Sequence, residues 1–168
     1  MSENFPPSIG PYNILAEIGK GGMSFVYRAS DSRTDEIVAL KVLPTRHADD
    51  PTYIRRFIRE GQNASRLNHP NIVKVYAAGE YDDYHTIAME LVEGGTLTDY
   101  LRGQWELLHP AIPINVIRQL ASGLDYAHQQ GFLHRDIKPS NVLLSGDLQE
   151  HGTRVLISDF GVARRMTQ

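Results

Sequence analysis

The chain has 168 residues, 41% of them hydrophobic, and a formal net charge of −3. That length and composition are enough to bury a core, and the small charge gives no electrostatic case for nucleic acid or an anionic membrane as main partner. No apolar run is long enough to span a bilayer, the first residues lack the features of a signal peptide, and there is no cysteine, so we expect a cytoplasmic protein without a membrane segment.

The first part of the chain is predicted to be rich in strands. Residues 1–11 form a lead-in that contains prolines. Strands are expected over Tyr12–Ile18 and Phe25–Ala29, joined as a hairpin by a glycine-rich turn. A third strand, Ile37–Leu43, should end at Pro44.

One main helix is predicted after the third strand. Asp50-Pro51 is typical of a helix start, with an aspartate as cap and a proline at the first helical position. Apolar residues at helical spacing continue to Leu67, so we expect the helix to end near Asn68-His69-Pro70. Two more strands, Ile72–Tyr76 and Thr86–Leu91, should follow.

Helices are predicted in the remainder. Glu93-Gly94-Gly95 interrupts the pattern, and Thr96 can cap a short helix through Leu101. A longer helix follows, and Gly131 suits its C-terminal end. Its predicted apolar stripe consists of Ile114, Ile117, Ala121, Leu124 and His128.

Two short strands, Val142–Leu144 and Val155–Ile157, are expected to flank a polar surface hairpin over Ser145–Arg154. The order of elements predicts an α+β arrangement, with a β-rich lobe containing one main helix over 12–91 and the beginning of a helical lobe over 92–168. A hinge is expected at about Glu90–Gly95, and ligand clefts prefer such lobe junctions.

The glycine-rich turn carries the first chemical signal. Gly19-Lys20-Gly21-Gly22-Met23-Ser24-Phe25-Val26 follows the pattern G-x-G-x-x-G-x-V, with Ser24 in the third glycine position. Glycines let backbone N–H groups approach phosphate oxygens closely. A strand follows where a dinucleotide-binding turn needs a helix, and the Gly-Lys-Ser/Thr ending of a Walker loop is absent. Alone, such a turn would be an ordinary glycine-rich hairpin.

Lys41 lies in an apolar strand, where alternation places it on the same face as Ala39 and Leu43. A half-buried lysine needs an anionic partner. The alternative is that Lys41 extends to solvent at the sheet edge. Gly61 should weaken the predicted main helix by about 1 kcal/mol.

The strongest signal is the stretch His134-Arg135-Asp136-Ile137-Lys138-Pro139-Ser140-Asn141, followed by Asp159-Phe160-Gly161. It places a potential base, a cation and two hard oxygen ligands for a metal within a short region. By itself, Asp136-Ile137-Lys138 would be a surface turn with a local ion pair.

Together, in this order, the glycine turn, the strand lysine, the His-Arg-Asp loop and Asp-Phe-Gly match the signature set of protein kinases. Over residues 12–165 the chain resembles a eukaryotic-type Ser/Thr protein kinase of the bacterial branch. Lysine at 138 followed by Pro139 resembles Ser/Thr rather than Tyr kinases. The resemblance implies transfer of the γ-phosphoryl group of ATP to Ser or Thr hydroxyls of a protein substrate, with ATP and Mg²⁺ as cofactors.

The resemblance also implies residue roles. Asp136 would be the catalytic base, and Lys138 would neutralise charge on the γ-phosphate. Asn141 and Asp159 would hold Mg²⁺, and Arg135 would pair with a phosphate on the activation loop. The resemblance also makes Glu60, in the middle of the predicted helix, the anionic partner of Lys41, whereas in the alternative Glu60 is solvated. The implied ATP-binding residues are Ile18, Gly19, Lys20, Gly21, Gly22, Met23, Ser24, Val26, Ala39, Lys41, Glu60, Met89, Glu90, Val92 and Leu143.

The sequence given stops at Gln168, before the Ala-Pro-Glu element that should follow Asp-Phe-Gly. We therefore interpret it as the N-terminal part of a kinase domain, and expect these residues alone to have little activity and a marginally stable helical lobe. Two alternatives stay open: a non-catalytic, pseudokinase-like binding fragment, and a small-molecule phosphotransferase of the same general fold.

Overall fold

The computed structural model describes residues 6–21, 24–44, 51–104, 109–160 and 164–165. The chain divides into two compact units. One contains Met1–Gln62 and Val75–Leu91, and the other contains Asn63–Lys74 and Val92–Gln168. The twelve-residue segment Asn63–Lys74 therefore belongs to the second unit, although both of its sequence neighbours belong to the first.

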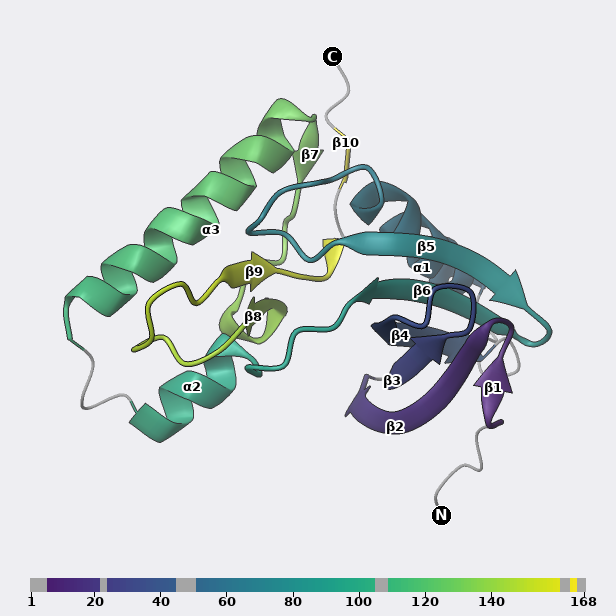
Figure 1. Cartoon of the computed structure of the whole chain (residues 1–168). Coiled ribbons are helices and arrows are strands. Elements are labelled where there is room, and N and C mark those ends of the chain that lie inside the picture. The colour runs from purple at the N-terminus through teal and green to yellow at the C-terminus, as the bar shows by residue number, and fades with distance from the viewer. Residues whose placement is uncertain (1–5, 22–23, 45–50, 105–108, 161–163, 166–168) are drawn as a thin grey trace. The chain divides into compact units, whose positions relative to one another are not determined.

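A six-stranded antiparallel sheet forms most of the first unit (Figure 1). Alternating apolar residues turn one face of the strands inward, as β3 shows with Phe25, Tyr27 and Ala29 buried beside Leu40 and Val42 of the next strand. The three strands and the hairpin expected in the first part of the chain are confirmed. In sheet order the strands are β1 (Ser8–Ile9), β2 (Tyr12–Lys20), β3 (Phe25–Asp31), β4 (Ile37–Pro44), β6 (Tyr84–Glu90) and β5 (Val75–Tyr81).

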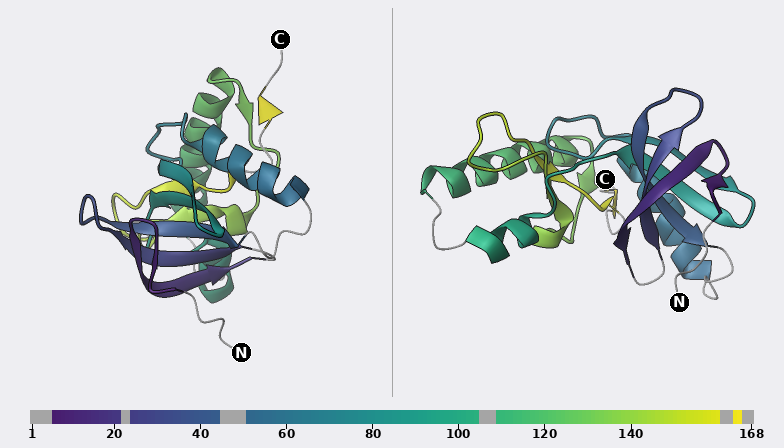
Figure 2. Two further views of the ribbon diagram at one scale, coloured as in Figure 1. Left: turned by 90° about the vertical axis from the view of Figure 1, so that its right-hand side faces the viewer. Right: turned by 60° about the horizontal axis from the view of Figure 1, so that its bottom comes forward.

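Helix α1 (Pro51–Ala64) lies against this sheet (Figures 1 and 2). It buries Phe57 beside Leu43 and Ile87. The helix ends before Leu67, so the predicted end near residues 68–70 is wrong. The last turn tightens, because the Leu67 amide donates to the Ala64 carbonyl three residues back. Leu67 is still buried, which is why its spacing suggested a longer helix.

The strand predicted over Ile72–Tyr76 is also shifted in the structure. Strand β5 begins at Val75, and Ile72 instead forms an isolated parallel bridge with Ile157. Ile72 and Val73 are both buried in the second unit. The apolar run that suggested one strand is therefore shared between two units.

The second unit contains helices α2 (Leu97–Gln104) and α3 (Ala111–Gln129). Thr96 caps α2 as expected: its hydroxyl accepts from the Asp99 amide, and Asp99 accepts from the Thr96 backbone in return. The remaining elements are the strand pair β7 (Phe132–Leu133) and β10 (Arg164–Arg165), the 3₁₀ turn η3 (Pro139–Asn141), and the strand pair β8 (Val142–Leu144) and β9 (Val155–Ile157).

The buried face of α3 differs from the predicted stripe. Val116, Gly123 and Ala127 are buried, whereas Ile114 and Ile117 are 59% and 65% exposed. Val116 packs with Val142 and Leu144 of β8 and with Val155 of β9. Small residues hide the true packing face from a hydrophobicity count, because Gly123 and Ala127 permit close approach without adding apolar bulk.

None of the helices in the described part of the chain combines the length and the apolar character needed to cross a bilayer.

Candidate active site

The glycine turn is the connection between β2 and β3. Gly19 pairs with Val26 and Lys20 with Phe25, and the Gly21 amide donates to the Ser24 carbonyl at 2.7 Å. The Lys20 ammonium lies 5.1 Å from the centre of the Phe25 ring, a cation–π distance. Two further predicted residues of the turn, Gly22 and Met23, lie outside the described residues.

Several of the predicted nucleotide-binding residues lie on neighbouring positions of the sheet. Val26 is directly opposite Lys41, and Ala39 is directly opposite Met89. Residues paired across two strands share a face of the sheet, and so do Ala39 and Lys41, which are two residues apart on β4. All four residues therefore lie on one face. Glu90 pairs with Val38 at the end of β6, and Ile18 on β2 is half exposed; Val92 and Leu143 belong to the second unit, where Leu143 pairs with Leu156.

Lys41 and Glu60 form an ion pair within the first unit. The Nζ–Oε1 distance is 2.7 Å, and the two side chains are only 15% and 16% exposed. Strand β4 presents Lys41 and Leu43 on the face against which α1 packs, and α1 presents Glu60 one turn after Phe57. The alternative with both groups solvated is therefore wrong.

Gly61 lets the helix come close enough for this pair. A Cβ at Gly61 would lie 2.8 Å from the Cβ of Ala78 on β5 and 3.2 Å from Ile87 on β6. Because the Ala78 Cβ is fixed to the backbone, such a contact requires the helix to shift. The glycine that weakens the helix is thus explained by its packing on the sheet.

Gly61→Ala is expected to destabilise the protein, although alanine is the better helix former by about 1 kcal/mol. Overpacking of a tight contact costs roughly 1–3 kcal/mol, so the net loss should be on the order of 1 kcal/mol. Urea unfolding measures it, with Arg59→Ala, an exposed position on the same helix, as the control. A Gly61→Ala protein more stable than wild type would show that α1 is not held at this contact.

In the second unit, one short loop brings Asp136, Lys138 and Asn141 together. The Lys138 ammonium lies 3.0 Å from Asp136 Oδ2. The Asn141 amide nitrogen donates to the same oxygen at 3.1 Å and to the Asp136 carbonyl at 2.9 Å. Turn η3 makes this possible, because the Asn141 backbone folds back and donates to the Lys138 carbonyl. Both side-chain contacts fall on Oδ2.

These neighbours determine the charge of Asp136. The hydrogen bond from Lys138 is the largest of the effects that lower the pKa of this carboxyl group, and Asn141 adds to it. The side chain is 42% exposed, so solvent screens the pair. Asp136 is therefore a carboxylate at neutral pH, able to accept a hydrogen bond.

His134 joins this loop to the segment that carries Asp159. It is 2% exposed, and its two ring nitrogens contact different partners. Nδ1 accepts from the Asp136 amide at 3.2 Å, and Nε2 lies 2.7 Å from the Ser158 carbonyl, to which it donates. The Phe160 ring packs edge-on against the imidazole, with centroids 4.6 Å apart. Both contacts are satisfied by one neutral tautomer of His134.

Burial lowers the pKa of His134 below its usual 6.5, which makes stability depend on pH. The unfolded chain then binds a proton more readily, so this contribution to stability is complete above about pH 6.5 and declines as the pH falls further. We expect the unfolding free energy of wild type to fall more between about pH 7.5 and about pH 5 than that of His134→Gln. Equal pH dependence in urea titrations of the two proteins would contradict it.

Backbone strain occurs at two positions of this region. Arg135 and Asp159 have positive φ angles, 67° and 60°, which residues with a side chain rarely adopt. Such conformations cluster at functional sites, where the surrounding contacts enforce them. Here the two strained residues are sequence neighbours of Asp136 and Ser158, the two residues to which His134 is hydrogen-bonded.

Hydrogen bonds link Asn141 to Ser158, the residue directly before Asp159. The Ser158 amide and hydroxyl both donate to the Asn141 carbonyl, at 2.9 Å and 3.1 Å. Asn141 is buried and its amide nitrogen donates to Asp136, so the amide oxygen is the side-chain atom left to bind a metal. Asp159 is exposed. No group of three His, Cys, Asp or Glu side chains in the described ranges could hold a metal by itself. One carboxylate and one amide oxygen do fit Mg²⁺, which usually binds few protein ligands together with phosphate oxygens.

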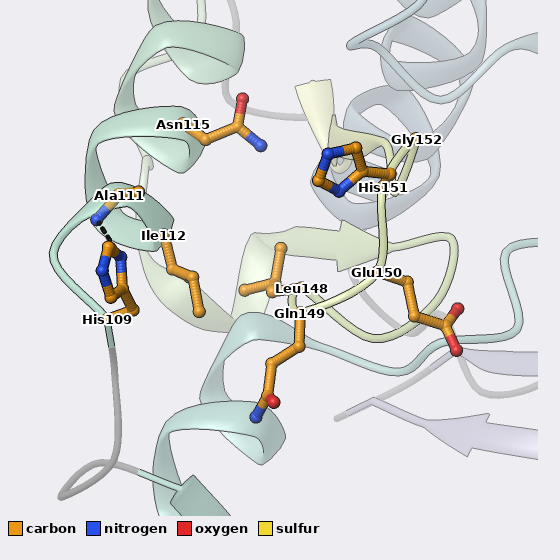
Figure 3. A pocket seen from close by; sticks show the side chains of 9 residues that line it. All are labelled: His109, Ala111, Ile112, Asn115, Leu148, Gln149, Glu150, His151 and Gly152. Atoms are coloured by element: carbon orange, nitrogen blue, oxygen red, sulfur yellow. Dashed lines mark hydrogen bonds between the residues drawn. The ribbon is translucent and has the colours of Figure 1, made fainter.

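A pocket of about 510 Å³ lies in the second unit, and none of the predicted site residues lines it. Figure 3 shows the first turns of α3 on one side, with Ile112 and Asn115, and the hairpin between β8 and β9 on the other, with Leu148 and His151. The predicted hairpin is confirmed, since the Ser145 amide donates to the Arg154 carbonyl.

Sequence reasoning missed Ser158, whose carbonyl and hydroxyl connect His134 with Asn141. It also missed Asn71 and Gln119, whose side chains contact each other and β9. No local pattern marks these residues, because each acts through partners far away in the sequence.

The antiparallel sheet with its lysine–glutamate pair, followed by the loop of Asp136 and the short strands around it, defines a kinase-like fold. Residues 12–168 match the protein kinase domain family. The chain is 45% identical over 158 residues to the serine/threonine-protein kinase PrkC of Bacillus subtilis, covering 94% of this chain and 24% of PrkC. It is 44% identical over 159 residues to the serine/threonine-protein kinase PknJ of Mycobacterium tuberculosis, covering 92% of this chain and 26% of PknJ.

A third relative, the probable serine/threonine-protein kinase PknB of Lactococcus lactis, is 40% identical over 94% of this chain and 24% of its own length. The chain belongs to the protein kinase family, within the bacterial kinases of eukaryotic type. It spans about a quarter of the length of the curated relatives it matches.

Proposed function

We propose that the protein is a Ser/Thr protein kinase that transfers the γ-phosphoryl group of ATP to Ser or Thr hydroxyls of protein substrates. The observation that carries this proposal is the arrangement of Asp136, whose Oδ2 is held by Lys138 and Asn141. The family and its bacterial Ser/Thr kinase relatives support it. The proposal places this domain in the cytoplasm, which the absence of cysteine supports.

In the first unit, Lys41 would bind the α- and β-phosphates of ATP, with Glu60 fixing the ammonium at 2.7 Å. The pair costs little to assemble on binding, because β4 and α1 already hold it. Backbone N–H groups of the glycine turn would contact phosphate oxygens. The adenine would bond to the backbone at Glu90, with Ile18, Val26, Ala39 and Met89 as its apolar contacts in this unit.

In the second unit, Asn141 and Asp159 would hold Mg²⁺. When bound, the metal would neutralise charge on the phosphate oxygens and keep them in position. The support is chemical: both residues supply hard oxygen donors, and Ser158 ties their backbones together.

Asp136 would orient the substrate hydroxyl through Oδ1 and accept its proton. The hydroxyl oxygen then forms a bond to the γ-phosphorus while the bond to the β-phosphate oxygen breaks, leaving ADP and a phosphorylated side chain. Lys138 would stabilise the charge on the moving phosphoryl group. Its contact with Asp136 keeps this cation beside the base.

The test is to incubate the full-length protein with Mg²⁺, γ-labelled ATP and generic protein substrates, and then to identify the labelled amino acids. Phosphoserine or phosphothreonine is the expected product. Nucleotide binding without any transfer would support a non-catalytic, pseudokinase-like role instead. Label found only in small molecules would support a small-molecule phosphotransferase.

A further inference from the structure

One edge of strand β9 is fully paired with another strand, and the opposite edge has a backbone neighbour over only part of its length. On one side it pairs with β8 over its whole length. On the other side, residues 71–73 reach only its end: the Ile157 amide donates to the Asn71 carbonyl at 2.9 Å, and the Val73 amide donates to the Ile157 carbonyl at 3.0 Å. This backbone neighbour begins at Asn71 and does not extend to Val155.

Two side-chain amides complete the hydrogen bonding where that neighbour stops. The Val155 N–H donates to Gln119 Oε1 at 2.9 Å, and the Val155 carbonyl accepts from Asn71 Nδ2 at 2.9 Å. Asn71 Nδ2 also donates to Gln119 Oε1 at 2.8 Å, and Gln119 Nε2 donates to the Thr153 carbonyl at 3.1 Å. We call these two amides the Asn71–Gln119 clamp.

The clamp satisfies groups that have no access to water. Val155 is 0% exposed, so its N–H and carbonyl need partners inside the protein. Apolar replacement of either amide would leave a buried backbone group without its hydrogen bond.

Helix α3 is placed so that Gln119 can reach the strand. Gly123, one turn later on the same side of the helix, lies where an added Cβ would be 3.0 Å from the Asn71 carbonyl and 3.1 Å from Ile157. This close approach brings the Gln119 amide to the β9 edge.

Strand β9 connects the clamp to both proposed magnesium ligands. It continues directly into Ser158 and Asp159, and Ser158 bonds to the Asn141 carbonyl through its amide and hydroxyl. Ile157 also pairs with Val142, the residue after Asn141. Val155 is thus connected to Asp159 through the intervening residues 156–158, and to Asn141 through the hydrogen bonds of Ser158.

We propose that Gln119 is a positioning residue for the magnesium site, acting through the Asn71–Gln119 clamp and β9. The inference rests on the proposed function, because it presumes that Asn141 and Asp159 bind the metal. Outer partners that orient metal ligands typically affect metal affinity by about 10- to 100-fold.

The test is Mn²⁺ binding to the full-length protein in the presence of a non-hydrolysable ATP analogue, measured by electron paramagnetic resonance. Gln119→Met keeps the length of the side chain and removes all three contacts. We expect it to weaken Mn²⁺ binding by about 10-fold or more. Asn71→Leu should weaken Mn²⁺ binding to a similar extent. The double variant should bind Mn²⁺ about as tightly as the weaker-binding single variant, because both substitutions act through one clamp.

Three controls separate positioning from general stability. Gln129→Met makes the same change at an exposed site of α3 and should leave Mn²⁺ affinity unchanged. Ala127→Gly lowers the stability of α3 without touching the clamp, and should lower the melting temperature with no loss of Mn²⁺ affinity. Gln119→Glu keeps the two contacts that Oε1 accepts but loses the donor to the Thr153 carbonyl, so its Mn²⁺ affinity should lie between those of wild type and Gln119→Met.

Unchanged Mn²⁺ affinity in Gln119→Met would overturn the proposal, as would an equal loss in Ala127→Gly. If Gln119→Met does not fold, Asn71→Leu tests the clamp from its other residue. Gln119→Glu tests it with the two contacts accepted by the side-chain oxygen retained. Wild-type protein that binds no Mn²⁺ with the nucleotide would overturn the proposed function, and the clamp's role with it. Wild-type binding with unaffected variants would overturn the clamp alone.

Discussion

Asp136→Asn is expected to lower the turnover by roughly 10²-fold or more while nucleotide affinity stays close to that of wild type. Asparagine keeps the shape of the side chain, and its amide oxygen can still accept from Lys138 and Asn141. It removes the negative charge that receives the hydroxyl proton. Because the side chain is not among the proposed phosphate-binding groups, binding of ATP should be spared.

Steady-state kinetics together with equilibrium nucleotide binding on the full-length protein measure both quantities. Asp125→Asn makes the same change at an exposed site of α3 and should leave both unchanged. A large loss of nucleotide affinity with turnover preserved at saturation would mean that Asp136 binds the nucleotide and does not act as the base.

Lys41→Ala is expected to reduce phosphoryl transfer by orders of magnitude, because catalysis of this reaction is mainly positioning and electrostatic stabilisation. The change removes the cation proposed for the α- and β-phosphates. It also leaves the Glu60 carboxylate, which is only 16% exposed, without that ammonium 2.7 Å away. The loss should therefore exceed what a screened surface charge would cause.

Lys74→Ala is the matched control, since Lys74 is exposed, and it should retain wild-type turnover. Circular dichroism of both variants separates lost positioning from lost folding. Turnover of a folded Lys41→Ala protein equal to that of wild type would remove Lys41 from the phosphate-binding site.

Local patterns predicted much of the fold. Strands β3 and β4 and the Thr96 cap of α2 appear in the structure at the expected positions. These features depend on residues close together in the sequence. The pairing of Lys41 with Glu60 spans 19 residues, and it could be predicted only because the resemblance supplied the partner.

The errors arise where long-range packing decides. Leu67 and Ile72 are apolar and buried, yet one lies beyond the end of α1 and the other bridges to Ile157 in the second unit. The packing face of α3 is built partly from Gly123 and Ala127, which carry little hydrophobic signal. Where each of these residues packs depends on which surfaces meet in three dimensions, and sequence periodicity alone does not predict that.

The candidate site shows the same division. Asp136, Lys138 and Asn141 come together because they belong to one loop. The Asn71–Gln119 clamp joins residues 48 and 36 positions apart in the sequence, and amides at such positions look like ordinary polar surface residues. Their role becomes visible only in the structure, where they hydrogen-bond to the backbone of Val155 at the edge of β9.

Transfer of the γ-phosphoryl group to a protein hydroxyl can be tested by comparing two labels in one assay. The full-length protein is incubated with Mg²⁺, a generic protein substrate and ATP labelled either at the γ- or at the α-phosphate. We expect labelled phosphoserine or phosphothreonine from γ-labelled ATP, no protein label from α-labelled ATP, and loss of transfer when Mg²⁺ is chelated. Protein labelled from α-labelled ATP, or no transfer by a protein that binds Mg-ATP, would contradict this expectation.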